Sequence, residues 1–431
     1  MTLVCRGSVP SRQGSPPRVA SQRALAGVAS ARGGAVADVQ PVKSPSLRPS
    51  YGLVVGLGDP VSDILVRLDD EGLASRVFTT CGIDEPGGCL PVDTDEDIQR
   101  LLSVCSREWV DGAGLPNLST DDAMVAEPVY CPGGSAANVM KGIANLGGEA
   151  SFVGMVGKDE VGRRYRELLA AQNVRPVLLE APDKPGESMS PNSAQCLSLV
   201  EKGGQRTMRT YLGASLRMDA ANFPEDEALD GARLLHVEGY TLYRPELAKA
   251  AMQAAKARGA TVSLDLASFE VVRNCRSQLI DILNSGAVDL LFANEDEAEQ
   301  LMRFFDEEPT MEGGVFTRAD ADRAMAIMLR YCQVATISLG ARGCVTMDAD
   351  GNRGVAPGVR VPVVDTTGAG DSFTAGFLHA YLSGAKLQAC ASAGCAVATQ
   401  VVQVLGAELT AIKWGELKGD VHGIIERLNK A

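Results

Sequence analysis

Long apolar runs, histidines and paired cysteines are scarce in this 431-residue chain. No run of eighteen apolar residues occurs, which argues against a membrane span. There are three histidines, and the eleven cysteines form no CxxC or CxxH spacing and follow no secretory signal, so we expect neither a metal cluster nor a disulfide framework. With 45% hydrophobic and 22% charged residues, the composition is that of a globular protein.

Acidic residues are nearly missing from the first fifty positions, which hold seven Lys or Arg and one acid, Asp38. This segment is rich in Arg, Ser, Ala and Gly and lacks the compact apolar stretch of a secretory signal. We therefore expect residues 1–50 to be a disordered transit peptide, with the chloroplast preferred over the mitochondrion. A basic tail without an address, on a cytoplasmic protein, is the alternative.

The rest of the chain is strongly acidic. Because the whole chain has a formal charge of −13, residues 51–431 carry about −19, which should repel nucleic acid. We therefore expect no nucleic-acid partner, and the lack of a long apolar run likewise argues against a membrane partner.

Short apolar runs of β-type residues alternate with helical segments from Tyr51 onward, and a helix is predicted over 245–258. Such runs are typical of buried parallel strands. The fold class expected is therefore α/β, a doubly wound and mainly parallel sheet flanked by helices, with ligands beyond the carboxyl ends of the strands. The predicted strands are YGLVVGLG (51–58), RLLHVEG (233–239), ATVSLDLA (260–267), the start of AVDLLFANEDEAEQL (287–301) and VATISLG (334–340).

A second, smaller sheet is expected beside the main one. Residues 194–213 alternate in polarity and turn at Gly203-Gly204, which is typical of a β-hairpin, and we interpret this hairpin as part of a small lid. Residues 72–123 look like an insertion with one short helix near Asp95, whose carboxylate could cap it. The expected lid strands lie at about 64–70, 124–131 and 193–213.

The stretch DTTGAGDSF (365–373) carries the clearest functional signal. If it joins the end of a strand at 360–365 to an amphipathic helix, then Gly368, Ala369 and Gly370 place backbone N–H groups at a helix N-terminus, where they attract an anion. Small residues are needed because a side chain would hold phosphoryl oxygens away from these amides. The stretch therefore predicts a phosphate site.

Two stretches resemble the signatures of the PfkB, or ribokinase-like, carbohydrate kinase family. The pattern Asp-Thr-x-Gly-Ala-Gly-Asp matches 365–371 at every fixed position, and the other signature matches GGSAANVMKGIANLGGEASFVGMVGKDEVG (133–162). The two lie in the family's order, about 230 residues apart, and the resemblance spans Tyr51 to the C-terminus. The matching positions are Asp365, Thr366, Gly368, Ala369, Gly370 and Asp371, and Gly133, Gly134, Asn138, Gly147, Gly154, Gly157, Asp159 and Gly162.

The resemblance implies a kinase that transfers the γ-phosphate of ATP to a hydroxyl of a sugar or nucleoside, with Mg²⁺. By this resemblance Asp371 is the catalytic base, and Gly368, Ala369 and Gly370 stabilise the transferring group. Taken alone, Asp371 could equally be an ordinary acid in the first turn of a helix.

The acceptor site implied by the resemblance consists of Asp63, Gly133, Gly134 and Asn138. Paired glycines let a ligand approach the backbone, and an Asn offers a donor and an acceptor to vicinal hydroxyls. A tight turn with a capping Asn is the alternative. Asp59 is interpreted as a turn residue.

The nucleotide-binding residues are predicted from less specific motifs. Asn294 and Glu297 match the family's Asn-x-x-Glu element, in which Glu297 would order Mg²⁺ through water, although the same spacing also describes a capping box. Gly340 and Gly343 would form the turn at the ATP edge, although an ordinary turn between strands would use the same residues. Thr366 is also predicted to lie on the nucleotide side.

The sequence does not decide the identity of the acceptor, and an unphosphorylated sugar or a nucleoside is preferred. A phosphorylated sugar would require basic residues, for which Arg206 and Arg209 are candidates unless they form a solvated strand face. A homodimer through the lid is compatible with the sequence, and the alternative function is a catalytically inactive kinase-fold scaffold or regulatory protein in a plastid. The aromatic residues considered for stacking a nucleobase are Phe78, Trp109, Tyr130 and Tyr211.

Overall fold

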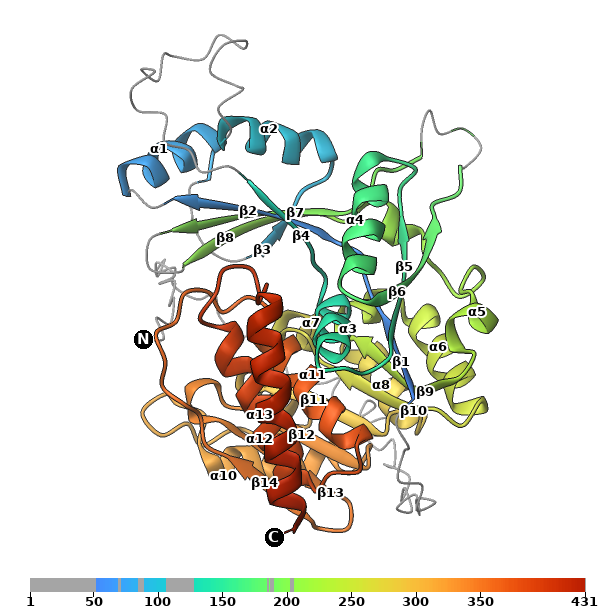
Figure 1. Cartoon of the computed structure of the whole chain (residues 1–431), viewed down its shortest axis with the longest axis vertical. Coiled ribbons are helices and arrows are strands. Elements are labelled where there is room, and N and C mark those ends of the chain that lie inside the picture. The colour runs from blue at the N-terminus through green and yellow to red at the C-terminus, as the bar shows by residue number, and fades with distance from the viewer. Residues whose placement is uncertain are drawn as a thin grey trace, which may run out of the picture. The chain divides into compact units, whose positions relative to one another are not determined.

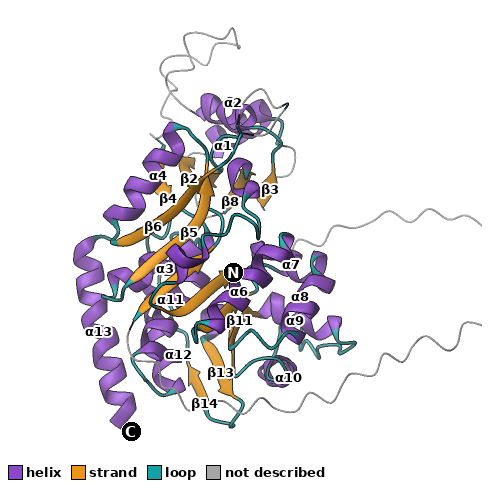
Figure 2. Ribbon diagram, turned by 90° about the vertical axis from the view of Figure 1, so that its right-hand side faces the viewer, coloured by secondary structure: helices purple, strands orange, loops and turns teal. Residues whose placement is uncertain are grey.

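The structure is a computed structural model, shown in Figures 1 and 2. The residues that it describes are 52–68, 71–83, 89–105, 128–183, 186, 190–201 and 205–430. The expected transit peptide, Trp109 and the Gly203-Gly204 turn lie outside these ranges. Within them, no helix has the length and apolar character needed to cross a membrane. The free thiols are Cys81, Cys131, Cys196, Cys275, Cys332, Cys344, Cys390 and Cys395.

The main sheet has nine strands, and from β12 to β6 all neighbouring strands run parallel. Two antiparallel strands, β13 and β14, extend it at one edge. The expected doubly wound, mainly parallel sheet is confirmed. In sheet order the strands are β14 (Arg353–Ala356), β13 (Cys344–Asp348), β12 (Val334–Ser338), β11 (Leu290–Asn294), β10 (Thr261–Asp265), β9 (Ala232–Glu238), β1 (Leu53–Leu57), β5 (Ala150–Val156) and β6 (Val174–Glu180).

Helices cover both faces of this sheet (Figure 2). One face packs against α5 (Glu225–Leu229), α6 (Pro245–Ala257), α7 (Phe269–Asn274), α8 (Arg276–Asn284), α9 (Glu295–Phe304) and α10 (Arg318–Met328). The other packs against α3 (Ser135–Asn145), α4 (Glu160–Ala171), α11 (Ala369–Leu382), α12 (Leu387–Val401) and α13 (Ala411–Lys430). Strand β9 shows why both layers are needed, because Leu234 faces one core and Leu235 the other, and both are fully buried.

Helix α6 illustrates how the sequence sets an element's ends. Pro245 occupies the first turn, where its missing N–H costs nothing, and buried residues recur at Leu247, Ala251 and Ala255 with helical spacing. The chain leaves the helix at Gly259, whose φ of 76° favours glycine. The predicted helix over 245–258 is therefore confirmed to within one residue.

The second sheet has five strands, and it contains the expected hairpin as β7 and β8. Figure 1 shows α1 (Glu71–Cys81) and α2 (Asp95–Cys105) lying over one face of this sheet. A small separate core lies between them, with Ile64, Leu197 and Phe78 among its members. In sheet order the strands are β3 (Cys89–Pro91), β8 (Arg206–Tyr211), β7 (Gln195–Glu201), β2 (Ser62–Leu68) and β4 (Val129–Pro132).

Two local predictions need correction. Helix α2 is capped by Thr94, whose hydroxyl accepts from the Asp97 N–H at 3.2 Å, whereas Asp95 accepts a hydrogen bond from Asn192. No strand forms at 360–365, because the Val364 N–H donates to the carbonyl of Val402 (2.8 Å) instead of to a strand.

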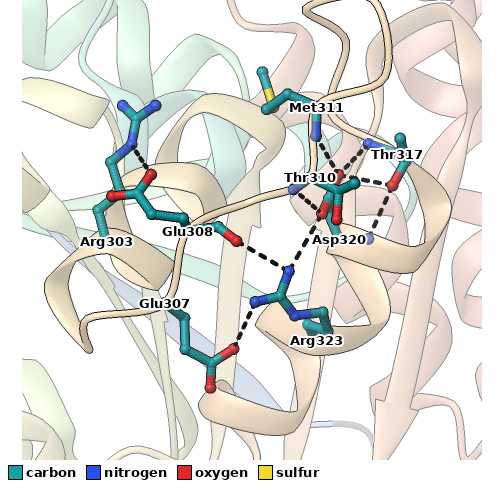
Figure 3. Close-up of polar contacts among 8 residues, drawn as sticks. All are labelled: Arg303, Glu307, Glu308, Thr310, Met311, Thr317, Asp320 and Arg323. Atoms are coloured by element: carbon teal, nitrogen blue, oxygen red, sulfur yellow. Dashed lines mark hydrogen bonds and ion pairs between the residues drawn. The ribbon is translucent and has the colours of Figure 1, made fainter.

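The connection between α9 and α10 is fixed by one buried carboxylate, that of Asp320 (Figure 3). It accepts hydrogen bonds from the backbone of Thr310 (2.7 Å), Met311 (3.3 Å) and Thr317 (2.9 Å), and from the Thr317 hydroxyl (2.7 Å). Arg323 lies 3.7 Å away and also donates to the carbonyl oxygen of Glu308. The loop is therefore organised around a charge that the loop itself satisfies.

Candidate active site

The glycine turn before α11 ends in a helix N-terminus without a side-chain cap. Gly368 is its N-cap residue, with a left-handed φ of 66°, and a Cβ there would lie 2.8 Å from the Cβ of Ala407. At Gly370 an added Cβ would meet no atom within 4 Å. The Ala369 N–H donates to the carbonyl oxygen of Thr366 at 3.3 Å, and the open space beside Gly370 leaves room for an anion at this helix N-terminus.

Asp371 is the third residue of this helix, and its carboxylate faces α3. The Ser135 hydroxyl donates to Oδ1 at 2.7 Å, and the Asn138 side-chain amide donates to Oδ2 at 2.9 Å. Burial raises the pKa of Asp371, and these two hydrogen bonds together with the charge of Lys141 partly oppose that rise. The structure thus brings together residues more than 230 positions apart in the sequence.

Helices α3 and α11 pack closely enough to hold this contact in place. A Cβ on Gly142 would lie 2.5 Å from the Cβ of Ala375. No side chain separates the two helices at that point, so the distance between Asn138 and Asp371 depends on backbone packing.

The glycine pair before α3 lies against two aspartates. A Cβ on Gly133 would lie 2.1 Å from the Asp63 carboxylate, and one on Gly134, whose φ is 94°, would lie 2.3 Å from the carbonyl oxygen of Asp59. Burial raises the pKa of Asp63 to about 7, with Lys141 opposing the rise and Asp371 adding to it. The two glycines are required here by the approach of the protein's own side chain and backbone.

Glu238, which ends β9, was missed by the sequence reasoning. One carboxylate oxygen accepts from the Asp59 N–H and the other from the Ala136 N–H, both at 2.8 Å. Burial raises the pKa of Glu238 to about 8, and the nearby Asp59 adds to the rise. An acid at the end of a buried strand was the available signal, because such positions line the ligand edge of the sheet.

Asp59 is more than an exposed turn residue. It is 5% exposed, and its carboxylate forms an ion pair with Arg244, which follows η3 (Gly239–Tyr243). The prediction of a turn residue is confirmed for the backbone, because the Asp59 carbonyl oxygen accepts from the Val61 N–H at 3.0 Å, but it missed the ion pair of the side chain.

Arg206 of β8 reaches from the second sheet to the DTTGAGD turn. Its guanidinium donates to the hydroxyls of Thr366 (3.2 Å) and Thr367, and its Nε lies 3.3 Å from Oδ1 of the buried Asp365. The solvated-face alternative is therefore wrong for Arg206. Thr366, predicted on the nucleotide side, contacts this arginine.

Asn294 and Glu297 form a complete capping box at the start of α9. The side-chain Oδ1 of Asn294 accepts from the Glu297 N–H (2.9 Å), while the Glu297 carboxylate accepts from the backbone N–H (2.8 Å) and side-chain amide (2.7 Å) of Asn294. Glu297 is 2% exposed, and burial followed by the charge of Asp265 raises its pKa well above the usual range. The arrangement is a helix cap with an acid buried near a second acid.

Asp265 ends β10 and lies among the same carboxylates. Its pKa is raised to about 6, first by burial and also by the charge of Asp371, against hydrogen bonds from Ala267 and Thr374. In the part of the chain that the structure describes, no three His, Cys, Asp or Glu residues are grouped closely enough to bind a metal directly. These acids could attract a hydrated cation without ligating it.

Gly340 and Gly343 lie in the turn between β12 and β13, which contains η4 (Gly340–Arg342). A Cβ on Gly343 would lie 1.9 Å from the carbonyl oxygen of Ala356, and its φ is 94°. Gly340 has a φ of 52° and lies near Glu295. Backbone packing alone thus requires glycine at position 343.

Three of the four aromatic residues considered for stacking lie in the described part of the chain. Phe78 is 6% exposed in the core beneath α1, so it is not available for stacking. Tyr130 lies under the guanidinium of Arg164, 4.5 Å from its ring centroid, and Tyr211 packs against the same core. Tyr240 and Tyr243, 41% and 52% exposed, follow the carboxyl end of β9 and were not predicted.

Comparison with known proteins identifies the family. The sequence pattern of the pfkB family carbohydrate kinases matches residues 115–414. The chain belongs to this family. As a pfkB family member it is a phosphotransferase with an alcohol group as acceptor, and ATP is the donor that kinase membership implies.

Similar proteins include both sugar and nucleoside kinases. The chain is 29% identical over 264 residues to Probable fructokinase-7 of Arabidopsis thaliana, covering 58% of this chain and 70% of that protein. It is 29% identical to Probable fructokinase-6, chloroplastic, of the same plant, over 57% of this chain and 61% of that protein. The crystal structure of adenosine kinase from Sinorhizobium meliloti matches with a TM-score of 0.66 and 27% identity, covering 88% of this chain and 99% of that chain. The ribokinase-like fold is thereby confirmed.

Proposed function

We propose that this pfkB family member transfers the γ-phosphate of ATP to a hydroxyl of a sugar or nucleoside, with Asp371 as general base. The observation that carries the proposal is the position of this carboxylate, which follows an uncapped glycine turn and is held by Ser135 and Asn138 from α3. A half-buried acid with a raised pKa is better suited to accept a proton near neutral pH than an ordinary aspartate.

Gly368, Ala369 and Gly370 are proposed to stabilise the transferring phosphoryl group through their backbone amides. The open space at Gly370 and the absence of a side-chain cap support this role. Phosphoryl transfer depends mainly on positioning and on donors directed at developing charge. The positive end of the α11 dipole adds to this stabilisation.

The acceptor is proposed to lie between Asp63, the Gly133-Gly134 turn and Asn138. Asp63 can accept hydrogen bonds from two vicinal hydroxyls, and its contact with Gly133 fixes its orientation. Asn138 hydrogen-bonds to Asp371, so an acceptor bound to Asn138 would lie next to the proposed base. Attack by the hydroxyl on phosphorus would then move its proton to the Asp371 carboxylate.

The nucleotide is proposed to extend from the glycine turn toward Asn294, Gly340, Gly343 and Thr366. Glu297 and Asp265 would favour hydrated Mg²⁺ near the phosphates, because a cation would offset the charge of Asp265 that raises the pKa of Glu297. Bound Mg²⁺ would neutralise phosphate charge. Arg206, already beside Thr366 and Thr367, would cover this region from the second sheet, which is why we retain the term lid for that sheet.

Location and assembly remain predictions. A plastid location is supported by the composition of residues 1–50 and by the similarity to a chloroplastic fructokinase. A lid-mediated homodimer would have to use the sheet edges at β3 or β4, because α1 and α2 cover one face.

The experiment that tests the function measures ADP release with ATP, Mg²⁺ and a panel of ribose, fructose, adenosine and other nucleosides. We expect release that depends on one class of acceptor, and a fall of about 10²- to 10⁴-fold in turnover for Asp371→Asn with little change in melting temperature. Glu246→Gln is the matched control, because Glu246 is an exposed first-turn acid of α6. Normal folding without ATP binding or acceptor-dependent ADP release would favour the scaffold alternative.

A further inference from the structure

Lys141 is a buried lysine on α3, only 5% exposed. Its ammonium group donates to the carbonyl oxygen of Pro132 at 2.6 Å and to Oε1 of Glu408 at 2.5 Å. A lysine is seldom buried to this extent, because desolvating its charge costs several kcal/mol unless partners compensate. Lys141 is therefore not explained by the usual role of lysine as a solvated surface charge.

The two partners of Lys141 belong to opposite sides of the proposed site. Pro132 directly precedes Gly133, which lies against the carboxylate of Asp63. Glu408 directly follows the turn whose Ala407 side chain lies against Gly368. The lysine thus connects the turn that presents the acceptor to the segment that supports the anion-binding glycines.

The segment before Glu408 has a second contact with the motif. The Gly406 N–H donates to Oδ2 of Asp365 at 3.0 Å, and Oδ1 of Asp365 accepts from the Thr367 N–H at 2.9 Å. Movement of Glu408 would therefore be transmitted to the start of the DTTGAGD turn.

Lys141 also lies one helical turn beyond Asn138, which holds Asp371. Of the described charged groups, Lys141 is the cation that lowers the pKa of Asp371, and Lys141 and Arg206 lower that of Asp63. The charged groups facing these two carboxylates come from β2 (Asp63), β8 (Arg206), β10 (Asp265), α3 (Lys141), α11 (Asp371) and the segment before α13 (Glu408).

We propose that Lys141 is a positioning residue whose buried ammonium group joins the acceptor turn to the anion-binding turn and places a positive charge near Asp63 and Asp371, with Glu408 as its counter-ion. This inference rests on the proposed function, in which the Asp371 carboxylate accepts a proton. A lysine kept only for stability would connect the same segments without changing the acidity of either aspartate.

The test compares Lys141→Met, Lys141→Arg and Lys141→Met/Glu408→Gln through the pH dependence of kcat/KM. Loss of the cation raises the pKa of Asp371, so the acid limb of the profile should move up by about one pH unit in Lys141→Met and return toward wild type in Lys141→Arg. The double variant also removes the partly buried Glu408 carboxylate that has lost its lysine, so it should recover stability yet keep the shifted limb. Lys256→Met, which removes the ion pair between Lys256 of α6 and Asp289, is the control and should leave the limb unchanged.

A second measurement separates this inference from the proposed function. Carboxyl ¹³C NMR titration of aspartate-labelled protein reports the acidity of Asp63 and Asp371 without turnover, with Asp371→Asn used for assignment. A higher Asp371 midpoint in both Lys141→Met variants supports the inference, whereas at Asp63 the rise is expected in the single variant, because loss of the Glu408 charge opposes it in the double variant. Unchanged midpoints, or a kcat/KM reduced equally at every pH, would overturn it. If Asp371→Asn kept full turnover, the proposed base would be wrong, while the NMR result would still decide the role of Lys141.

Discussion

Helices α10 and α11 both carry an aspartate as the third residue after the N-cap, and the two aspartates have opposite environments. Asp320 of α10 is enclosed by its own loop and accepts four hydrogen bonds from it (Figure 3). Asp371 of α11 follows a glycine N-cap and takes its two hydrogen bonds from a different helix. Position in the helix therefore does not distinguish a structural acid from a candidate base.

The acidity of the two groups follows from these partners. Burial alone would raise the pKa of Asp320, but the hydrogen bonds from Thr310, Thr317 and Met311 hold it well below the usual range. At Asp371 burial prevails over two hydrogen bonds, and the pKa is raised. In these two aspartates the balance between burial and hydrogen bonds to the charged form sets the direction of the pKa shift.

Glu297 at the same position of α9 lies between these extremes. It completes a capping box, as Asp320 does, yet its pKa is raised, as that of Asp371 is. Glu297 caps its helix and also has a raised pKa, so an experiment has to decide between a purely structural role and a role near the cation.

Of the effects that would test the contrast between Asp320 and Asp371, the largest is expected on the stability of an Asp320 variant. Asp320→Asn leaves buried donors without an acceptor, so the free energy of unfolding should fall by about 2–4 kcal/mol while kcat of the folded protein is kept. Chemical denaturation at pH 7 and steady-state kinetics measure the two quantities.

The same carboxylate predicts a pH effect. Because its pKa is lowered in the folded state, its stabilisation is present above the unfolded value of about 4 and is lost as the pH falls toward the folded value. Wild type should therefore lose more stability than Asp320→Asn on acidification below about pH 4. An equal loss in both proteins would refute the assignment of Asp320.

The next effect concerns the open space at Gly370. Gly370→Ala should fold normally, because its Cβ meets nothing within 4 Å, but should lower kcat/KM about tenfold or more by excluding a phosphoryl oxygen. Gly415→Ala in α13 is the matched control, since that Cβ also meets nothing. If both variants were fully active, the α11 terminus would not be the phosphate site.

A smaller effect is expected at Glu297. Glu297→Gln keeps the size of the side chain but removes a charge that would attract hydrated Mg²⁺, so the Mg²⁺ concentration for half-maximal activity should rise a few-fold. Activity titrated against Mg²⁺, with melting temperature as control, gives the answer. An unchanged titration would assign Glu297 to the capping box alone.

The smallest effect on catalysis is expected from removal of the predicted transit peptide. Removal of residues 1–50 should leave kcat and KM unchanged, because the predicted kinase domain begins at Tyr51. N-terminal sequencing of the protein from cells should give a start between about Ala31 and Tyr51. An intact Met1 start would contradict the transit peptide.

The main sheet could be predicted from sequence because each parallel strand is a short apolar run, and α6 because proline and glycine mark its ends. Residues 360–365 were misread because Val363 and Val364 are β-type residues, although they are 58% and 39% exposed and lie outside any strand. Local propensity does not reveal that the backbone of Val364 pairs with Val402.

Candidate site residues within one motif could be named from the sequence, whereas their partners could not. Nothing near Asp371 in the chain indicates that Ser135 would donate to it, and nothing near Asp59 indicates Arg244. These pairs depend on how distant segments meet at the sheet edge, which is tertiary information. The glycines were recognised correctly as special, but at Gly133 and Gly343 the close neighbours are the protein's own atoms.

The absence of any side chain at Gly142 has a consequence for protein engineering. At Gly142 there is no room for a methyl group between α3 and α11. A larger residue at 142 would therefore push the two helices apart and misalign Asn138 with Asp371 without touching any ligand. Libraries intended to change acceptor preference should therefore keep position 142 fixed and vary the inner face of the lid, on β2, β7 and β8, where exchange of side chains leaves that alignment intact.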